Sequence, residues 1–162
     1  MFSKLEKHIS IPPQPEKEFA SNSVVVEETI LLIELNSADT IQLTKLRGIG
    51  KGYARRIIAY RQLLGGYHNP NQLLEVYGFP KDLFESISPH IWVDTLSVNK
   101  ININMVDYQD LRKHPYLNEH QAKSIIYYRE TIGNIKSINE IFKNKLVDSK
   151  TFDRIKNYLT VN

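Results

Sequence analysis

Residues 46–54 read LRGIGKGYA and place three glycines at alternate positions in an otherwise helix-forming stretch. A glycine within a helix costs about 1 kcal/mol relative to alanine. Three of them so close together predict either a helix end or a backbone that a ligand approaches closely. Leu46 and Ile49 would hold two helices together, while Gly48 and Gly50 permit a tight turn between them. Such a turn leaves amide N–H groups uncovered at the start of the second helix, where they and the helix dipole form an anion site.

The chain repeats itself at an offset of 68 residues, which places residues 33–91 on residues 101–159 without a gap. Chance similarity does not keep one offset over so long a stretch. A second offset of 30 residues aligns LRGIGKGYARRI (46–57) with VYGFPKDLFESI (76–87). The sequence therefore predicts two tandem copies, each built from two helical hairpins packed on one another.

The ends of the predicted helices follow from capping residues. Asn36 and Asn104 are expected as N-caps, each answered by an aspartate three residues on in the manner of a capping box. Gly65 and Gly133 are expected to end the long helices in a left-handed conformation. Ser137–Glu140 is expected to open a helix as a capping box.

These patterns predict an all-α fold of two small, SAM-like helical domains with short extended segments before each. Segments rich in β-branched residues, 23–35 and 95–103, are expected either to form a short strand pair or to lie against the helices. The expected organisation is a flexible or extended N-terminal segment (1–32), a first basic domain (33–94), a linker (95–102) and a second, degenerate domain (103–162).

The composition is that of an ordinary globular chain, with 41% hydrophobic and 24% charged residues and no cysteine. Its net charge of +3 is mildly basic and compatible with an anionic partner. No apolar run approaches the roughly 20 residues that span a bilayer, and the N-terminal stretch lacks a signal-like apolar core. No carboxylate cluster or serine–histidine pair suggests catalysis, and His114 and His120 are poorly spaced for a metal site. We expect neither an enzyme nor a small-molecule substrate.

The positive charge is concentrated in the first hairpin. Residues 36–64 contain six Lys or Arg side chains and one acidic side chain, which gives +5, whereas residues 104–132 contain four of each. In the second copy Tyr116 and Asn118 stand where the first has Gly48 and Gly50, and their side chains are expected to cover the amides. The second copy is therefore expected to keep the scaffold and to lose the phosphate site.

From about residue 33 onward the chain resembles the helix-hairpin-helix proteins related to ComEA, the late-competence DNA receptor. The motifs ELNSAD, LRGIGKGYARRIIAYR and QLLEVYGF, with the stop at Gly65, carry the resemblance. The second copy matches in scaffold but not in its hairpin. The resemblance implies binding of double-stranded DNA without sequence preference, usually at the outer face of a bacterial membrane during DNA uptake. It favours a bacterial periplasm or cell envelope as the location, with the cytoplasm as the alternative.

The charge pattern and the resemblance together predict the site residues. The expected DNA-phosphate site comprises Arg47, Gly48, Ile49, Gly50, Lys51, Gly52 and Arg55. The resemblance also implies that a monovalent cation, K⁺ or Na⁺, can be held by backbone carbonyls, which by position are those of Thr44, Leu46 and Ile49. No other cofactor is expected.

Other interpretations stand beside this one. The three glycines could serve the turn alone. The same fold could serve a cell-envelope protein whose basic patch meets an acidic protein surface, with a protein partner bound by the second copy. A third role is that of a DNA-targeting subunit of a repair or recombination complex, with catalysis on another chain. In each case the second copy either braces the first or binds a partner.

Several residues are expected to be structural. The hairpin at Gly78 is one, because Pro80 lacks an amide donor and Asp82 repels phosphate. Arg61 and Arg129 are expected either to cap helix carbonyls or to form pairs inside the fold. Packing is also the expected role of most tyrosines, namely Tyr53, Tyr60, Tyr67, Tyr127 and Tyr128.

Overall fold

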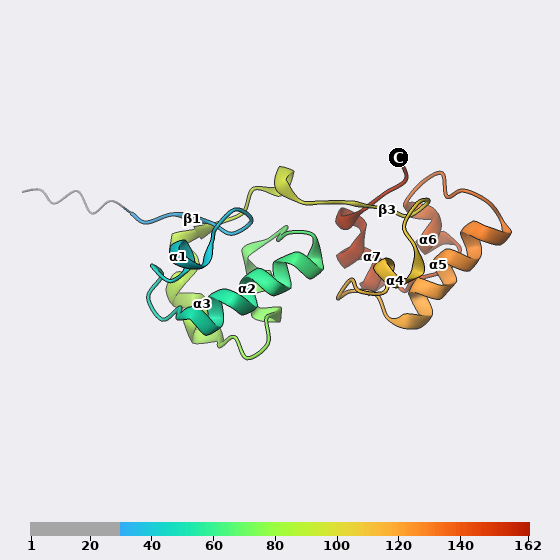
Figure 1. Cartoon of the computed structure of the whole chain (residues 1–162). Helices are drawn as coiled ribbons and strands as arrows, with labels where there is room; N and C mark the ends of the chain where they lie inside the picture. The colour runs from blue at the N-terminus through green and yellow to red at the C-terminus, as the bar shows by residue number, and fades with distance from the viewer. Residues whose placement is uncertain (1–29) are drawn as a thin grey trace, which may run out of the picture.

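The computed structural model describes residues 30–162, and the prediction for residues 1–29 lies outside this part of the chain. Two helical units of the same design lie next to each other (Figure 1). The segment between them contains one turn of 3-10 helix, η3 (Thr95–Ser97). Helices dominate both units and the strands are two residues long, so the all-α fold class is confirmed.

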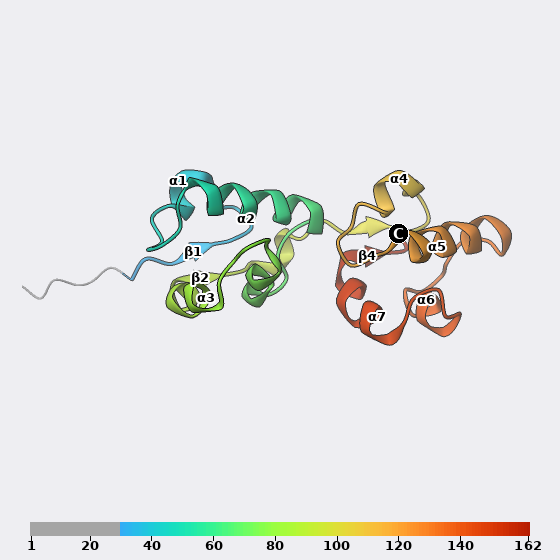
Figure 2. The ribbon, with the colours of Figure 1, turned by 90° about the horizontal axis from the view of Figure 1, so that it is seen from below.

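The first unit consists of two stacked hairpins closed by a pair of short strands. Its elements are β1 (Ile33–Glu34), α1 (Thr40–Leu43), α2 (Lys51–Leu64), the 3-10 helix η1 (Pro70–Glu75), α3 (Lys81–Ile87), the 3-10 turn η2 (Ser88–His90) and β2 (Ile91–Trp92). Figure 2 shows α1 and α2 on one side of the strands and α3 on the other. The 30-residue periodicity of the sequence therefore corresponds to the two hairpins, α1–α2 and η1–α3.

The second unit repeats this order. Its elements are β3 (Ile101–Asn102), α4 (Tyr108–Leu111), α5 (Glu119–Thr131), α6 (Asn139–Lys143), α7 (Ser149–Ile155), the 3-10 turn η4 (Lys156–Tyr158) and β4 (Leu159–Thr160). An α-helix, α6, stands where the first unit has the 3-10 helix η1.

Both strand pairs are parallel, and each joins the beginning of a unit to its end. Ile33 pairs with Ile91 in the first unit, and Ile101 pairs with Leu159 in the second. Within the described residues, β1 and β3 therefore do not pair with each other. Each one closes its own unit, because its buried or half-buried isoleucine lies against the strand that follows the last helix.

The prediction of Asn36 and Asn104 as N-caps is wrong. Asp39 and Asp107 cap α1 and α4, and each carboxylate accepts a hydrogen bond from the backbone N–H three residues on, at 2.7 Å. Because a carboxylate at this position already satisfies the first turn, the asparagines are available for another role.

Each asparagine joins the start of its unit to the loop after the long helix. The Oδ1 atom of Asn36 accepts from the N–H of Tyr67 at 2.6 Å, and its Nδ2 donates to the carbonyls of Tyr67 and Asp94 at 2.8 and 3.0 Å. Asn104 makes the same contacts with Ile135 and Val161. A side-chain amide satisfies three backbone groups here, which explains why the residue type recurs at the repeat offset.

The long helices end differently in the two units. Gly65 ends α2 with φ of +85°, as predicted. The right-handed Ile132 ends α5, and Gly133 follows it with φ of +118°. The predicted capping box at Ser137–Glu140 is present in part, since Glu140 accepts from the N–H of Ser137 at 3.1 Å, but α6 begins only at Asn139.

Arg61 and Arg129 are half-buried and bind within the fold, as predicted, but the carbonyls that they bind lie before the first helix of each unit and not at a helix end. The Nη1 atom of Arg61 donates to the carbonyls of Leu35 and Ala38, both at 2.8 Å. Arg129 makes the equivalent bonds in the second unit, at 2.9 and 2.7 Å. Each arginine fixes the turn before the short first helix against the long second one.

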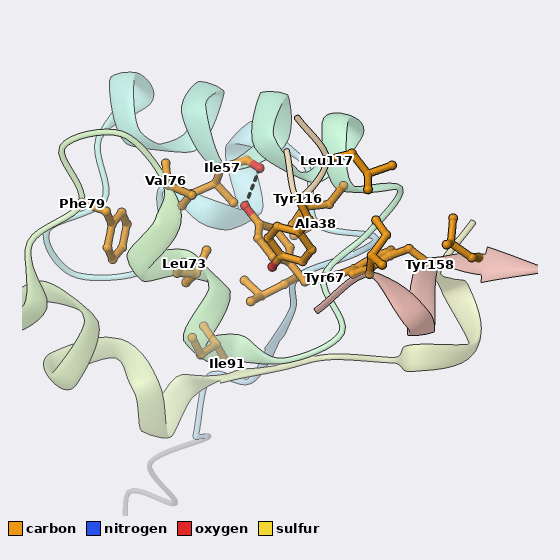
Figure 3. Close-up of a cluster of buried hydrophobic side chains, with 14 of the residues drawn as sticks. Ala38, Ile57, Tyr67, Leu73, Val76, Phe79, Ile91, Tyr116, Leu117 and Tyr158 are labelled. Atoms are coloured by element: carbon orange, nitrogen blue, oxygen red, sulfur yellow. Dashed lines mark hydrogen bonds between the residues drawn. The ribbon is translucent and has the colours of Figure 1, made fainter. Parts of the chain in front are cut away.

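The buried side chains of the two units form one cluster. Tyr67 of the first unit is fully buried and donates its hydroxyl to the carbonyl of Ile57 at 2.7 Å, drawn as a dashed line in Figure 3. Tyr116, Leu117 and Tyr158 of the second unit lie beside it in the same view. The second unit therefore packs directly on the first.

Candidate nucleic-acid interface

The first hairpin forms the tight turn that its glycines predict. Gly48 has φ of +88°, and a Cβ atom there would lie 2.6 Å from Cδ1 of Leu83. Only glycine meets both conditions without strain. Leu46 and Ile49 on either side are buried, and the N–H of Ile49 donates to the carbonyl of Leu46 at 3.0 Å.

The N-terminus of α2 is uncovered. Its N-cap is Gly50, which supplies no side-chain acceptor. A Cβ atom added at Gly50 or at Gly52 would meet nothing within 4 Å. Among the hydrogen bonds of the described residues, none uses the N–H of Gly50, Lys51 or Gly52. Three adjacent donors at the positive end of a 14-residue helix are arranged to bind an anion.

Basic side chains surround this helix end. Lys45, Arg47, Lys51 and Arg55 are all exposed. Within residues 30–162, no ion pair involves any of these four. The other two cations of the +5 stretch bind backbone carbonyls, the half-buried Arg61 as described above and the exposed Arg56 through a bond from its Nη1 to the carbonyl of Tyr77 at 3.2 Å. Four exposed cations therefore face solvent beside the open amides.

The second copy closes the equivalent helix end. Asn118 stands at the position of Gly50, and its Oδ1 accepts from the N–H of Gln121 at 2.8 Å. Gln121 returns a bond by accepting from the N–H of Asn118 at 3.0 Å, which completes a capping box. Lys51 is replaced by Glu119, which forms an ion pair with Lys123 at 2.7 Å. The predicted covering of the amides is thus confirmed in part: the N–H groups of Asn118 and Gln121 are satisfied, whereas no hydrogen bond among the described residues uses those of Glu119 and His120.

For Tyr116 that prediction is wrong, because this side chain points away from its own hairpin. Its hydroxyl accepts a hydrogen bond from Nε2 of Gln72 at 2.6 Å and donates to Glu75 at 2.8 Å. The same Gln72 amide donates to the hydroxyl of Tyr158 at 2.8 Å. Arg154 bonds Glu75 at 3.0 Å, and its guanidinium carbon lies 3.9 Å from the centre of the Tyr116 ring. The degenerate hairpin is therefore a docking element that holds the second copy against the first.

His114, at the position of Leu46, belongs to the same interface between the copies. It is buried, its Nε2 lies 3.1 Å from the carbonyl of Leu64, and its Nδ1 accepts from the N–H of Tyr116 at 3.2 Å. The two bonds require the neutral ring with its proton on Nε2. Burial lowers the pKa of His114 to about 4, and the positive charge of Arg154 adds to this effect.

The carbonyl groups proposed for a cation are partly available. The carbonyl of Leu46 accepts from Ile49, whereas no hydrogen bond among the described residues reaches the carbonyl oxygen of Thr44 or of Ile49. Backbone oxygens are donors of the kind that a hard monovalent cation takes, so the donor chemistry is compatible with the cation site that the resemblance implies. Within residues 30–162, no group of three or more His, Asp or Glu side chains is placed to hold a metal ion.

Sequence reasoning missed the contact between α2 and the tip of the η1–α3 hairpin of the same unit. The Tyr53 hydroxyl donates to the carbonyl of Gly78 at 3.3 Å, and Arg56 binds the preceding carbonyl, that of Tyr77. A signal was available in the 30-residue offset, which aligns Tyr77 with Arg47 and so places both at hairpin tips.

None of the helices in the described part of the chain is long and apolar enough to cross a membrane. Both units match a motif of known proteins. The helix-hairpin-helix motif matches residues 29–92 and again residues 97–160.

Curated relatives share the name "Endonuclease/exonuclease/phosphatase family domain-containing protein 1". The protein from Danio rerio is 27% identical over 185 residues, and that from Homo sapiens is 24% identical over 195 residues. Each alignment covers 96% of this chain but only about a third of the relative, 33% and 34% respectively. No solved structure gives a significant match. On the two matches that span both of its units, the chain belongs to the helix-hairpin-helix family.

Proposed function

We propose that this chain binds double-stranded DNA without sequence preference, through phosphate groups held at the first hairpin. The open N-terminus of α2 at Gly50 carries the proposal, because the structure closes the equivalent position of the second copy with Asn118. Amide donors and a helix dipole bind phosphate oxygens irrespective of the base. In this account Arg47, Lys51 and Arg55 flank the phosphate that the open amides of Gly50, Lys51 and Gly52 hold, whereas the amide of Ile49 is bound to the carbonyl of Leu46.

The exposed cations set the strength and the salt dependence of binding. Four of them lie beside the hairpin, and a contact between each cation and a phosphate releases counterions. A single site of this size corresponds to a dissociation constant of about 10⁻⁴ to 10⁻⁶ M at physiological salt. A monovalent cation on the carbonyls of Thr44, Leu46 and Ile49 would add positive charge next to the phosphate.

Two biological roles are compatible with this activity. The resemblance of the first copy to the ComEA-related proteins supports a receptor for DNA uptake at a bacterial cell surface. The name of the curated relatives instead favours a DNA-targeting module that serves an endonuclease/exonuclease/phosphatase domain, as in repair or recombination. Because the chain spans about a third of those relatives, the second role places the chemistry outside the residues described here.

A role in binding another protein has less support. Tyr116 and Tyr158 of the second copy are buried against the first copy, so they are not available to a partner. The exposed Tyr127 on α5 is the remaining candidate contact for a protein partner.

Fluorescence anisotropy of a labelled duplex of about 25 base pairs, titrated with this chain over a salt series, tests the proposal. The expected result is binding that is independent of sequence, weakens as salt rises, and is lost in Gly50→Glu while circular dichroism shows an unchanged fold. If the wild-type chain does not bind at low salt, the proposal is wrong, and the three glycines serve only to form the turn.

A further inference from the structure

Tyr77, at the tip of the η1–α3 hairpin, is an aromatic side chain that the fold leaves in solvent on a fixed backbone. It is 87% exposed. Its carbonyl and that of Gly78 are both bound by side chains of α2, those of Arg56 and Tyr53. Gly78 has φ of +70°, and a Cβ atom there would lie 3.2 Å from Nη1 of Arg56, so glycine permits this close approach. The backbone that carries the exposed ring is therefore held in place before any ligand arrives.

Arg56 lies between two aromatic rings. Its guanidinium carbon is 5.5 Å from the centre of the Tyr53 ring and 5.9 Å from the centre of the Tyr77 ring. Unpaired nucleic-acid bases stack on aromatic rings and on guanidinium planes. Tyr77 of the η1–α3 hairpin and Arg56 of α2 thus present both kinds of stacking surface side by side.

This stacking surface is close to the proposed phosphate site. Arg56 follows Gly52 by one helical turn, a rise of about 6 Å along α2. Successive nucleotides of one DNA strand advance by about 3.4 Å. Arg56, whose Nη1 binds the carbonyl of Tyr77, therefore lies about two nucleotide steps along α2 from Gly52.

The chemistry at this tip suits a base better than a phosphate. The N-cap of α3 is Pro80, and the first turn of the helix carries Asp82. Lys81 forms an ion pair with Glu85 at 3.6 Å, which reduces its attraction for a second anion. The equivalent residue in the second copy is Lys145, so the aromatic platform is specific to the copy that has the open helix end.

We propose that Tyr77, together with Arg56, stacks on an unpaired base next to the duplex that the first hairpin holds. The preferred ligand is then a duplex with an adjoining single strand, such as an overhang or a gap, because bases inside an intact duplex are already stacked on one another. The inference rests on the proposed function and deepens it by naming the class of DNA.

The test compares a blunt duplex, the same duplex with a short single-stranded overhang, and a longer blunt duplex with the same number of phosphates as the second. Affinities are measured by anisotropy for the wild type, Tyr77→Ala and Tyr77→Phe. Tyr127→Ala, which removes an exposed tyrosine from α5 of the second copy, is the matched control. A fluorescent base analogue at the first unpaired position reports stacking directly.

The wild type should bind the overhang at least about fivefold more tightly than either blunt duplex, since stacking is worth roughly 1–3 kcal/mol per base. Tyr77→Ala should bring the ratio of overhang to blunt-duplex affinity to about 1 and should remove the quenching of the analogue's fluorescence. The affinity for the blunt duplex should not change. Tyr77→Phe and Tyr127→Ala should keep the ratio. Equal affinity of the wild type for all three DNAs, or an equal loss for all three in Tyr77→Ala, would overturn the inference.

The proposed function fails by a different outcome. If Gly50→Glu binds the blunt duplex as well as the wild type does, the first hairpin is not the phosphate site, whatever the overhang ratio is. If Gly50→Glu loses blunt-duplex binding while the wild type shows no preference for the overhang, only the stacking role of Tyr77 is wrong.

Discussion

Gly50 and Asn118 occupy the same position in the two copies, directly before the long helix, and differ in whether a side chain caps that helix. Asn118 caps α5 with its side chain, whereas Gly50 supplies no cap to α2. Asparagine is a better N-cap than glycine, so the first copy forgoes a stabilising hydrogen bond that the second copy makes. In our account the amides of α2 stay open because they bind a ligand.

The residues that follow Gly50 and Asn118 carry opposite charges, Lys51 and Glu119, and this difference predicts the effect of a substitution at Lys51. In Lys51→Glu the new carboxylate would face Arg55 four residues on, as Glu119 faces Lys123 in the second copy. We expect the stability to change by less than about 0.5 kcal/mol, because exposed pairs of this kind contribute little. DNA affinity should fall, and the slope of log affinity against log salt should decrease by about 1 for each phosphate that the variant no longer neutralises.

The control for this prediction is Lys150→Glu, which makes the same charge change at an exposed lysine of α7 in the second copy. It should leave both the affinity and the slope nearly unchanged. Equal effects of the two substitutions would indicate that DNA responds only to the net charge of the chain.

Gly48 and Gly52 should respond oppositely to alanine in stability. Gly48→Ala forces a side chain into left-handed backbone and within 2.6 Å of Leu83, so it should destabilise the fold by more than about 1 kcal/mol. Gly52→Ala has open space and a helical position, so it should be neutral or stabilise by up to about 1 kcal/mol. Urea unfolding of the two variants checks both signs. A large destabilisation in Gly52→Ala would contradict the open geometry of α2.

His114 predicts a loss of stability in mild acid. Its pKa is about 4 in the folded chain, below the usual 6.5. The unfolded chain therefore binds the proton more tightly, and the contribution of His114 is complete above pH 6.5 and is lost as the pH falls toward 4. The shift corresponds to about 3 kcal/mol. Urea unfolding from pH 7 to pH 4 should show this loss, and His114→Leu should remove that part of the pH dependence.

The hydroxyls of Tyr116 and Tyr158 should be energetically coupled through Gln72. Each single change to phenylalanine leaves the buried amide of Gln72 one partner and should cost about 1 kcal/mol. The double change leaves that amide nitrogen with neither hydroxyl and should cost more than the sum of the single changes, by about 0.5–3 kcal/mol. Strict additivity in a double-mutant cycle would show that the two copies do not share this network in solution.

The sequence predicted the repeated scaffold because its signals are local. The 68-residue repeat, the buried Leu46 and Ile49 and the left-handed Gly65 all follow from spacing and backbone preference. The asparagine N-caps were wrong because Asn36 bonds to Tyr67, 31 residues away, and capping preference says nothing about such a bond.

The candidate site was predictable only in part, for a similar reason. The open amides and the exposed Lys51 follow from the LRGIGKG stretch itself. The docking of Tyr116 on Gln72 and the binding of Arg56 to the second hairpin join residues 44 and 21 positions apart. These interactions depend on how the units and hairpins pack, which no pattern within a single hairpin specifies.

The most direct test of the central claim is the affinity of Gly50→Asn for a blunt duplex, measured beside the wild type at one low salt concentration. This change gives α2 the side-chain acceptor that caps α5, without the returning bond of Gln121, since Tyr53 stands at that position. The site is open space at φ of −88°, so the fold should be as stable as the wild type or slightly more stable. If the uncovered amides bind phosphate, the variant should lose most of its affinity although all four exposed cations remain. Undiminished binding by a folded Gly50→Asn would show that the open helix end is not the DNA site.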